Sequence, residues 1–523
     1  MKYRNFNIDK QYILLFIFSF AVLLFCSATS PIYNGHDWTD ANTYLTMARG
    51  LLNGRVPYLD LFDHKGPILY FIYAAGAIVD PNGFLGVFIL QVLAMSFTLL
   101  FIYKIFMIYT SSRNLSLIGA FMLPIFLLTS GIYYLPQKLD YGGGSAEEFC
   151  VPFFAFSIWI VTKNLSKHSH NWEMYDFFFI GAAIGVVFQI KFNLTLFFGG
   201  LLLPIAIDFI IKRKFRNLFV VMSFVFSGLV LTVLPYLIYA IATKSVSHFF
   251  EAYIFFNKSY AFKESMPLFV LFKHIILQGL RTFLSTPKVS ATILGSLIGL
   301  LCMKGPSILW RLSILCSMVF TGISVFAGQV MPYTLLPLLL YSFCITLAIL
   351  ARLKVREYGE KTVQAIMICT AGLIFACTIF SNKMVFYKDF VTSSAMTCQQ
   401  QISQIVKQGP FQQPTLLEAG MLNRGFYNNL GIIPSIYYFY LPNVSYDQHP
   451  EILDSQIDAI LCEKTDYVVL QWNSKDLTYS NIPNDNAYSQ LYSAAFNHYK
   501  LVSIIRGTGA VEDLYYYLFM RRM

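Results

Sequence analysis

Residues 35–67 read GHDWTDANTYLTMARGLLNGRVPYLDLFDHKGP, a polar and aromatic stretch that follows an apolar run near the N-terminus. Its apolar side chains recur at three- and four-residue spacing, at Tyr44, Met47, Ala48, Leu51 and Leu52. This spacing predicts a helix that lies on a membrane surface with one apolar face. Asp40 lies just before the first of these apolar residues, near the start of the helix, where the helix dipole favours a negative charge. Gly54 ends the helix.

The composition is that of a polytopic membrane protein. Of 523 residues, 56% are apolar and only 13% are charged, whereas soluble domains have about 25% charged residues. The formal net charge is +10, but the basic residues lie in short loops between apolar runs. Anionic inner leaflets and the positive-inside rule account for that pattern. We therefore expect membrane lipid, and not nucleic acid, as the surrounding partner.

The apolar runs predict about 11 transmembrane helices, each close to the 20 residues that a span needs. They cover 11–30, 84–108, 114–133, 148–163, 176–191, 194–211, 218–242, 287–303, 308–326, 333–350 and 363–381. The shorter apolar run 66–80 is expected to lie at the interface, because counting it as a span would place most later basic loops outside. A second interfacial helix is expected within 243–286.

The basic loops predict the orientation of the chain. Lys and Arg residues gather in 1–10, 104–113, 163–175, 212–217, 304–311 and 351–361. The positive-inside rule assigns these segments to the cytoplasm. The N-terminus is then cytoplasmic, and the long segments 31–83, 243–286 and 382–523 are extracytoplasmic.

The last part of the chain changes to the composition of a soluble domain. Strands are expected at 415–420, 466–472, 499–506 and 513–520, and helices near 391–408, 449–463 and 486–497. Alternation of such elements fits a small α/β domain. The sequence thus divides into a membrane module, 1–381, and an extracytoplasmic α/β domain, 382–523.

A second polar segment combines glycines with acids. Gly142, Gly143 and Gly144 precede Glu147 and Glu148, which open an apolar helix at the outer face. Glycines allow a ligand to approach the backbone closely. An ordinary turn followed by acids at a helix start would give the same pattern, and the sequence does not choose between the two glutamates.

The first outer loop resembles that of the GT-C glycosyltransferases, in the branch of protein mannosyltransferases and lipid A aminoarabinose transferases. The matching positions are Asp40, Tyr44, Ala48-Arg49, Gly54, Pro57 and Lys65-Gly66-Pro67. Ala41 stands where the branch usually has a second acid. Two weaker matches to this branch are Lys191, at an outer helix end, and Pro332-Tyr333, at the start of a late span.

The resemblance implies a GT-C architecture and a set of site residues. Asp40 would be the catalytic carboxylate, with Glu147 or Glu148 as the acid of the second loop. Lys65, together with Lys191 or Arg49, would bind the phosphate of the donor. Asp40, Glu147 and Glu148 are also the candidate ligands if a divalent metal ion takes part.

These residues suit transfer of a sugar from a polyprenyl-phosphate donor to an extracytoplasmic acceptor, which can be lipid, glycan or protein. No P-loop or dinucleotide-binding glycine motif occurs, which favours a lipid-linked donor over a nucleotide sugar. The alternative is a transporter or flippase of a lipid-linked glycan. That class predicts inverted repeats and charges near the middle of the membrane, but the sequence has no repeat and few charges within its apolar runs.

Overall fold

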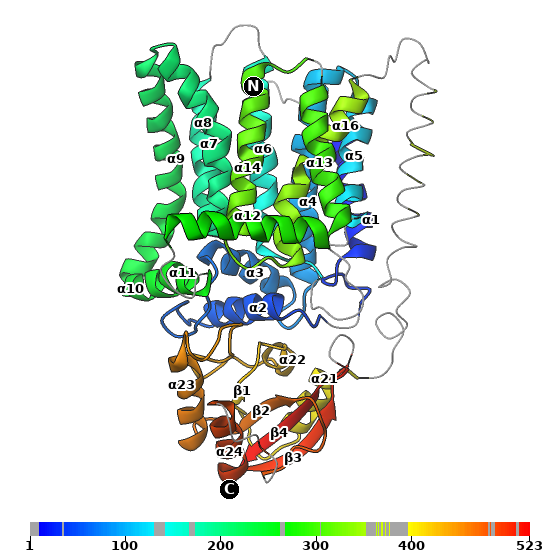
Figure 1. Cartoon of the computed structure of the whole chain (residues 1–523). Helices are drawn as coiled ribbons and strands as arrows, with labels where there is room; N and C mark the ends of the chain where they lie inside the picture. The colour runs from blue at the N-terminus through cyan, green and yellow to red at the C-terminus, as the bar shows by residue number, and fades with distance from the viewer. Residues whose placement is uncertain are drawn as a thin grey trace, which may run out of the picture.

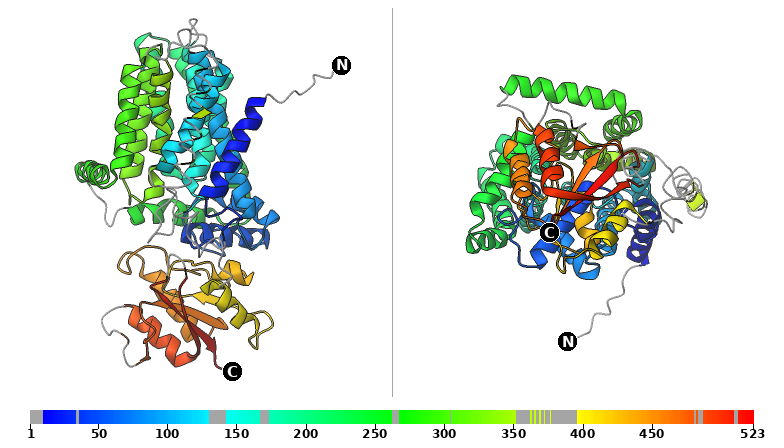
Figure 2. Two further views of the ribbon diagram at one scale, coloured as in Figure 1. Left: turned by 90° about the vertical axis from the view of Figure 1, so that its right-hand side faces the viewer. Right: turned by 90° about the horizontal axis from the view of Figure 1, so that it is seen from below.

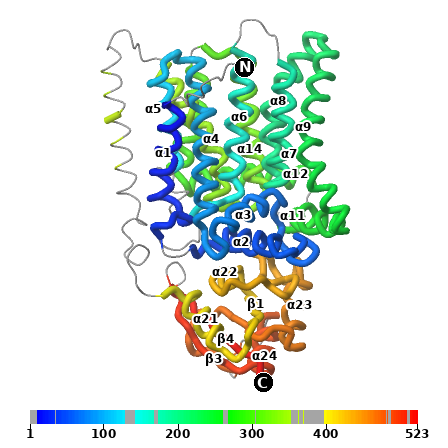
Figure 3. Tube along the Cα trace, turned by 180° about the vertical axis from the view of Figure 1, so that it is seen from behind, coloured from blue at the N-terminus to red at the C-terminus, as the bar shows by residue number. Residues whose placement is uncertain are grey.

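The computed structural model describes residues 10–33, 36–129, 142–166, 173–261, 267–303, 305–351, 396–479, 487–508 and 512–523, with a few isolated positions between. Its larger part is a bundle of helices that run side by side, and a small domain with a sheet lies below one end of the bundle (Figure 1). Seen from behind, α2 (Thr39–Leu52) and α3 (Pro67–Val79) lie between the bundle and this domain (Figure 3).

The bundle helices coincide with the predicted apolar runs. They are α1 (Lys10–Cys26), α4 (Leu85–Thr110), α5 (Arg113–Thr129), α6 (Ala146–Ser166), α7 (Met174–Phe188), α8 (Leu196–Ile211), α9 (Phe215–Ala242), α13 (Pro287–Cys302), α14 (Ile308–Phe326) and α16 (Phe343–Leu350). Short helices η3 (Pro332–Leu335), α15 (Leu336–Leu339) and η4 (Leu340–Ser342) lead into α16. The predicted span 363–381 falls almost entirely outside the described residues.

Several helices at the base of the bundle do not follow its axis. They are α2 (Thr39–Leu52), α3 (Pro67–Val79), α10 (Val246–Phe249), η2 (Phe250–Phe255), α11 (Phe256–Ala261) and α12 (Leu268–Ser285). Of the described helices, seven are long and apolar enough to cross a membrane, and α12 is one of them. It nevertheless runs across the bundle helices (Figures 1 and 2). The interfacial positions expected for 66–80 and within 243–286 agree with this arrangement.

The C-terminal domain contains the four predicted strands. They are β1 (Leu416–Glu418), β2 (Tyr467–Trp472), β3 (Tyr499–Arg506) and β4 (Tyr515–Arg521), in the spatial order β1-β2-β4-β3. β1 and β2 are parallel, and the other two pairs are antiparallel. The helices are α21 (Cys398–Lys407), α22 (Phe426–Leu430), α23 (Pro450–Leu461) and α24 (Ala487–His498).

Glycines set the close approach of α7 and α9. A Cβ atom on Gly181 would clash with the main-chain oxygen of Val225, and one on Gly228 would clash with the oxygen of Phe178. Small residues let helices approach closely where apolar lipid gives no hydrophobic drive for their association. The α7–α9 contact therefore depends on main-chain packing.

We expect Gly181→Ala to lower the free energy of unfolding by about 2 kcal/mol, since the added methyl group must push two backbones apart. Gly199→Ala in α8 is the matched control, because the nearest atom to its new Cβ would be 3.7 Å away, on Phe320. The control should be neutral or slightly stabilising. Thermal unfolding in detergent compares the two, and equal melting temperatures would contradict this account of the packing.

Candidate functional site

Asp40 lies in the first turn of α2, as predicted. Its Oδ2 accepts hydrogen bonds from the hydroxyls of Tyr44, one turn later at 3.2 Å, and Tyr333, at 3.0 Å. Tyr333 belongs to η3, 293 residues further along the chain. Two hydroxyl donors on one oxygen hold the carboxylate in a fixed orientation.

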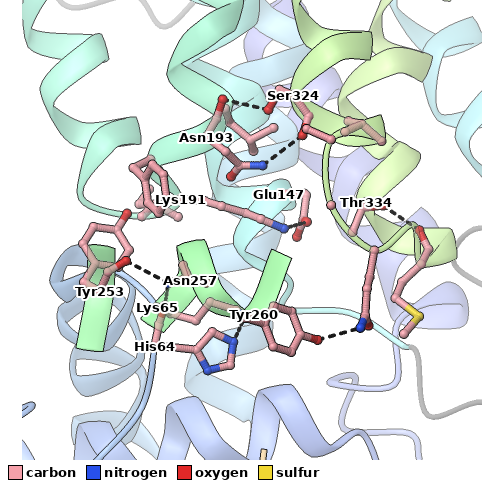
Figure 4. Close-up of a pocket in the computed structure, with 18 of the residues that line it drawn as sticks. His64, Lys65, Glu147, Lys191, Asn193, Tyr253, Asn257, Tyr260, Ser324 and Thr334 are labelled. Carbon is pink, nitrogen blue, oxygen red and sulfur yellow. Dashed lines mark hydrogen bonds and ion pairs between the residues drawn. The ribbon is translucent and has the colours of Figure 1, made fainter. Parts of the chain in front are cut away.

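A cavity of about 390 Å³ opens between the base helices and the ends of α6, α7 and α14 (Figure 4). Its polar lining includes Lys65, Glu147 and Lys191, and further lining residues are His64, Asn193, Tyr253, Asn257, Lys258, Tyr260, Gln329 and Tyr333. Tyr333 thus lines the cavity and also donates to Asp40. Asp40 itself is not among the lining residues, and it is linked to the cavity through the Tyr333 hydroxyl.

Glu147 and Lys191 form an ion pair inside the cavity. Lys191 Nζ bonds Glu147 Oε1, and the lysine also lies 6.0 Å from the ring centre of Tyr333. The Glu147 side chain is 1% exposed, whereas that of Lys191 is 20% exposed. Among the residues that the structure describes, Glu147 Oε2 is buried without a hydrogen-bond partner. One carboxylate oxygen of Glu147, and the Lys191 donors that Glu147 does not use, therefore remain for a ligand.

Lys65 brings a second ammonium group to the same cavity. Its Nζ lies 2.9 Å from His64 Nε2. The backbone around it is held by tyrosines, since Tyr58 Oη donates to the Lys65 carbonyl at 2.5 Å and the Lys65 amide donates to Tyr70 Oη at 3.1 Å. A Cβ on Gly66 would clash with the Gln189 carbonyl, so this loop is packed directly on the end of α7.

Glu148 points elsewhere. Its carboxylate bonds the Gln91 amide and accepts from the Ser145 amide at 3.3 Å. Gln91 in turn accepts from Ser27 at 2.8 Å and Thr29 at 2.6 Å. Glu148 is therefore part of a buried polar network that ties α6 to α4 and the end of α1. Only Glu147 of the two candidate acids lines the cavity.

The predicted role of the glycine segment as a close approach to a ligand is not what the structure shows. A Cβ on Gly142 would meet Ala28, and one on Gly143 would meet Ser27. Gly144 has φ +84° and faces the Tyr73 hydroxyl. These residues are glycine because the segment packs against other parts of the protein.

Arg49 also lies away from the cavity, which corrects its predicted place beside the donor phosphate. Its guanidinium is buried, and Nη1 donates to the Tyr427 carbonyl at 3.0 Å and to Asn428 Oδ1 at 3.3 Å. Both partners belong to α22 of the C-terminal domain. Arg49 therefore joins α2 to that domain.

The rest of the polar face of α2 is buried in the same contact. Asn428 Nδ2 donates to Asn42 Oδ1 at 3.0 Å, Thr46 Oγ1 lies 3.2 Å from Asn428 Oδ1, and Asn423 donates to Thr46 at 3.0 Å. All four side chains are 2% exposed or less. The helix that carries Asp40 is thus enclosed on the side away from the membrane module.

The C-terminal domain also contacts the two other segments at the cavity. Tyr440 donates to Asp63 Oδ1 at 2.8 Å, next to His64. Ser259 in α11 lies 2.8 Å from His449 Nε2. Sequence reasoning missed these contacts and the cavity residues of α11, because no local pattern shows which distant segments meet.

The carboxylates proposed as metal ligands have separate partners. Asp40 accepts from two tyrosines, Glu147 pairs with Lys191, and Glu148 bonds Gln91. Among the residues that the structure describes, no group of three His, Cys, Asp or Glu side chains is placed to hold a metal ion. The predicted trio does not fit a shared ion, and no step is assigned to a metal.

Comparison with solved structures identifies the fold. ArnT from Cupriavidus metallidurans bound to undecaprenyl phosphate matches with a TM-score of 0.56 and 11% identity, covering 97% of each chain. The apo form of that protein gives a TM-score of 0.54 over 98% of each chain. The oligosaccharyltransferase of Archaeoglobus fulgidus, in complex with Zn and sulfate, gives 0.52 at 11% identity, over 97% of this chain and 73% of that one. The predicted GT-C fold is confirmed.

Sequence comparison gives the family. No curated protein matches the chain. The family model described as the competence-induced protein Ccs4 N-terminal domain matches residues 4–365, which is more than half of the sequence. This match covers α2, the cavity and the bundle helices, and ends before the C-terminal domain. The chain is therefore a GT-C-fold integral membrane protein that belongs to the competence-induced Ccs4 N-terminal domain family.

Proposed function

We propose that the protein is a glycosyltransferase that moves a sugar from a polyprenyl-phosphate carrier to an acceptor outside the cytoplasm. The observation that carries this proposal is the cavity at the base of the bundle, where Lys65 and Lys191 lie beside Glu147 and Tyr333 links them to Asp40. A phosphate group matches two ammonium donors, and a hydroxyl acceptor matches a carboxylate. The ArnT structure, with its bound undecaprenyl phosphate, supports a ligand of this class.

The reaction assigns a role to each group. The acceptor oxygen attacks the anomeric carbon of the donor sugar while the bond from that carbon to the phosphate oxygen breaks. The polyprenyl phosphate leaves with the bonding electrons, and Lys65 and Lys191 stabilise its added negative charge. Asp40 accepts the proton of the acceptor hydroxyl. Tyr44 and Tyr333 keep Asp40 in position for that transfer.

The same proposal sets the orientation. The basic segments predicted to be cytoplasmic include the α8–α9 turn at 212–217, and the C-terminal domain would lie outside with the cavity. Residues 1–381 would form the catalytic membrane module, and 382–523 the extracytoplasmic domain that closes it. A phosphate lipid in the outer leaflet could then reach the cavity directly from the membrane.

Native and introduced cysteines test this orientation. Cys462 is exposed in the C-terminal domain, and Arg213 is exposed in the α8–α9 turn. We expect a membrane-impermeant maleimide to label Cys462 in intact cells and to label Arg213→Cys only after permeabilisation. Mass spectrometry of the two peptides reads the result. Labelling of Arg213→Cys in intact cells would show that the chain has the opposite orientation.

Mass spectrometry of surface glycans and lipid-linked sugars tests the function. We expect cells without the protein to lose one sugar substituent and to accumulate its polyprenyl-phosphate donor. Cells that make the Asp40→Asn variant should show the same two changes. Unchanged glycans and lipids would contradict the proposal. Normal glycans in the variant, with loss only in the deletion, would favour the transporter instead.

A further inference from the structure

The residue next to Lys65 has an arrangement that the proposed reaction does not use. His64 is 9% exposed and lines the cavity. Its ring packs against both Phe256 and Tyr260, with centroids at 5.4 and 5.3 Å, and its carbonyl accepts from Asn257 at 2.6 Å. Three side chains of the α11 region thus fix both the ring and the backbone of this histidine.

The two ring nitrogens of His64 face groups of opposite charge. Nε2 lies 2.9 Å from the Lys65 ammonium, and Nδ1 lies 3.4 Å from Asp63 Oδ1. Burial, with Lys65 and Lys191 nearby, lowers the pKa of His64 well below its ordinary value. The imidazole is therefore neutral at pH 7. An ammonium has only donors, so Nε2 must accept, and the ring proton is on Nδ1. Among the residues that the structure describes, Nδ1 has no hydrogen-bond partner, and Asp63 Oδ1 accepts instead from the main-chain amide of His64 at 2.7 Å.

Asp63 is itself oriented by hydroxyl groups. Tyr70 donates to its Oδ2 at 2.8 Å, and Tyr440 of the C-terminal domain donates to its Oδ1 at 2.8 Å. The Asp63 side chain is 2% exposed. Because Asp63 Oδ1 also accepts from the main-chain amide of His64, Tyr440 and Asp63 hold the backbone that carries His64 and Lys65.

We propose that His64 is a positioning residue that holds the Lys65 ammonium at the cavity wall, with Asp63 and Tyr440 fixing the backbone of His64. The role of this ammonium toward a lipid phosphate rests on the proposed function, but its restraint by His64 does not. One of the three N–H donors of Lys65 bonds His64, which leaves two donors for phosphate oxygens. The C-terminal domain contributes to donor binding through this contact without touching the lipid.

Lysine labelling tests the restraint without any substrate. Purified protein is treated with limiting acetic anhydride, and acetylation of each lysine is measured by peptide mass spectrometry. The hydrogen bond to His64 restrains the Lys65 amine at the cavity wall, so His64→Ala should raise the acetylation rate of Lys65 about tenfold, which corresponds to the free energy of about one hydrogen bond. His64→Gln supplies an amide oxygen as acceptor and should restore most of the slow rate.

Other lysines serve as internal controls. Lys191, which is paired with Glu147, should keep its rate in both variants and so report an intact cavity. Lys258 is exposed and should label fast throughout. Tyr440→Phe removes only a hydroxyl, so it keeps the fold and should raise the Lys65 rate about threefold. Unchanged Lys65 labelling in both His64→Ala and Tyr440→Phe would overturn the proposal.

A binding measurement separates this inference from the proposed function. Undecaprenyl phosphate in nanodiscs is titrated onto the wild-type protein, His64→Ala and His64→Gln. We expect His64→Ala to weaken binding about tenfold and His64→Gln to bind nearly as the wild type does. If the wild type binds no lipid phosphate while the labelling results hold, the proposed function fails and the positioning of Lys65 by His64 stands. Normal binding by His64→Ala would refute the role of His64 in donor binding.

Discussion

Asp40→Asn is expected to lower the rate of sugar transfer by about a hundredfold to ten-thousandfold, the usual cost of losing a general base. The amide keeps the size of the side chain, and its oxygen still accepts from Tyr44 and Tyr333. The protein should therefore stay folded, with a loss of about 1 kcal/mol or less from the helix start. Lipid phosphate binding should be retained, because the lysines of the cavity are untouched.

Asp37→Asn is the matched control for this loss. Asp37 lies three residues earlier, and its Oδ1 accepts from Gln399 of α21 at 3.2 Å. This contact joins Asp37 to the C-terminal domain, whereas Tyr333 joins Asp40 to the cavity. We expect transfer within a few fold of wild type. Equal losses in the two variants, at equal melting temperature, would show that Asp40 is not the base.

Glu147→Ala is expected to lower the free energy of unfolding by about 2 kcal/mol and to abolish transfer. Removing one member of a buried ion pair leaves an uncompensated charge, which typically costs about 3–5 kcal/mol, and the partial exposure of Lys191 reduces that figure. Without the carboxylate, Lys191 is also free to leave the cavity wall. Chemical denaturation in mixed micelles measures the change in the free energy of unfolding.

Two further variants separate stability from chemistry. Glu147→Leu combined with Lys191→Met replaces the pair by apolar groups, which is often close to neutral for stability, yet transfer should remain absent. Asp208→Ala breaks the exposed pair between Asp208 and Lys212 on α8 and should cost about 0.5 kcal/mol or less. A double variant with normal transfer would exclude Lys191 from the reaction.

Local patterns predicted the elements well. The bundle helices before residue 351, the interfacial α3 and the four strands follow from hydrophobic period and run length, since each is a short-range property. The cover that the C-terminal domain forms over α2 could not be predicted. Asn42, Thr46 and Arg49 form the polar face of an amphipathic helix, and such a face usually meets water. Here it is buried because α22 provides matching amide groups.

The candidate site could be predicted only in part, because contacts between distant segments are not a short-range property of the sequence. Asp40, Lys65 and Lys191 lie on separate segments, and only the family resemblance suggested that they meet. The choice between Glu147 and Glu148 depends on helix rotation, which places adjacent residues on different faces, and no sequence pattern fixes it. Arg49 was misplaced because its neighbour in space is 378 residues away along the chain.

The central claim is that the cavity holds the phosphate of a polyprenyl carrier between Lys65 and Lys191, within reach of Asp40. Electron cryomicroscopy of the protein in nanodiscs with undecaprenyl phosphate tests it most directly. We predict phosphate density within about 3 Å of both ammonium groups, the range of charge-assisted hydrogen bonds, with the lipid chain leaving toward the bundle. Phosphate density at another place on the protein, with this cavity empty, would contradict the account.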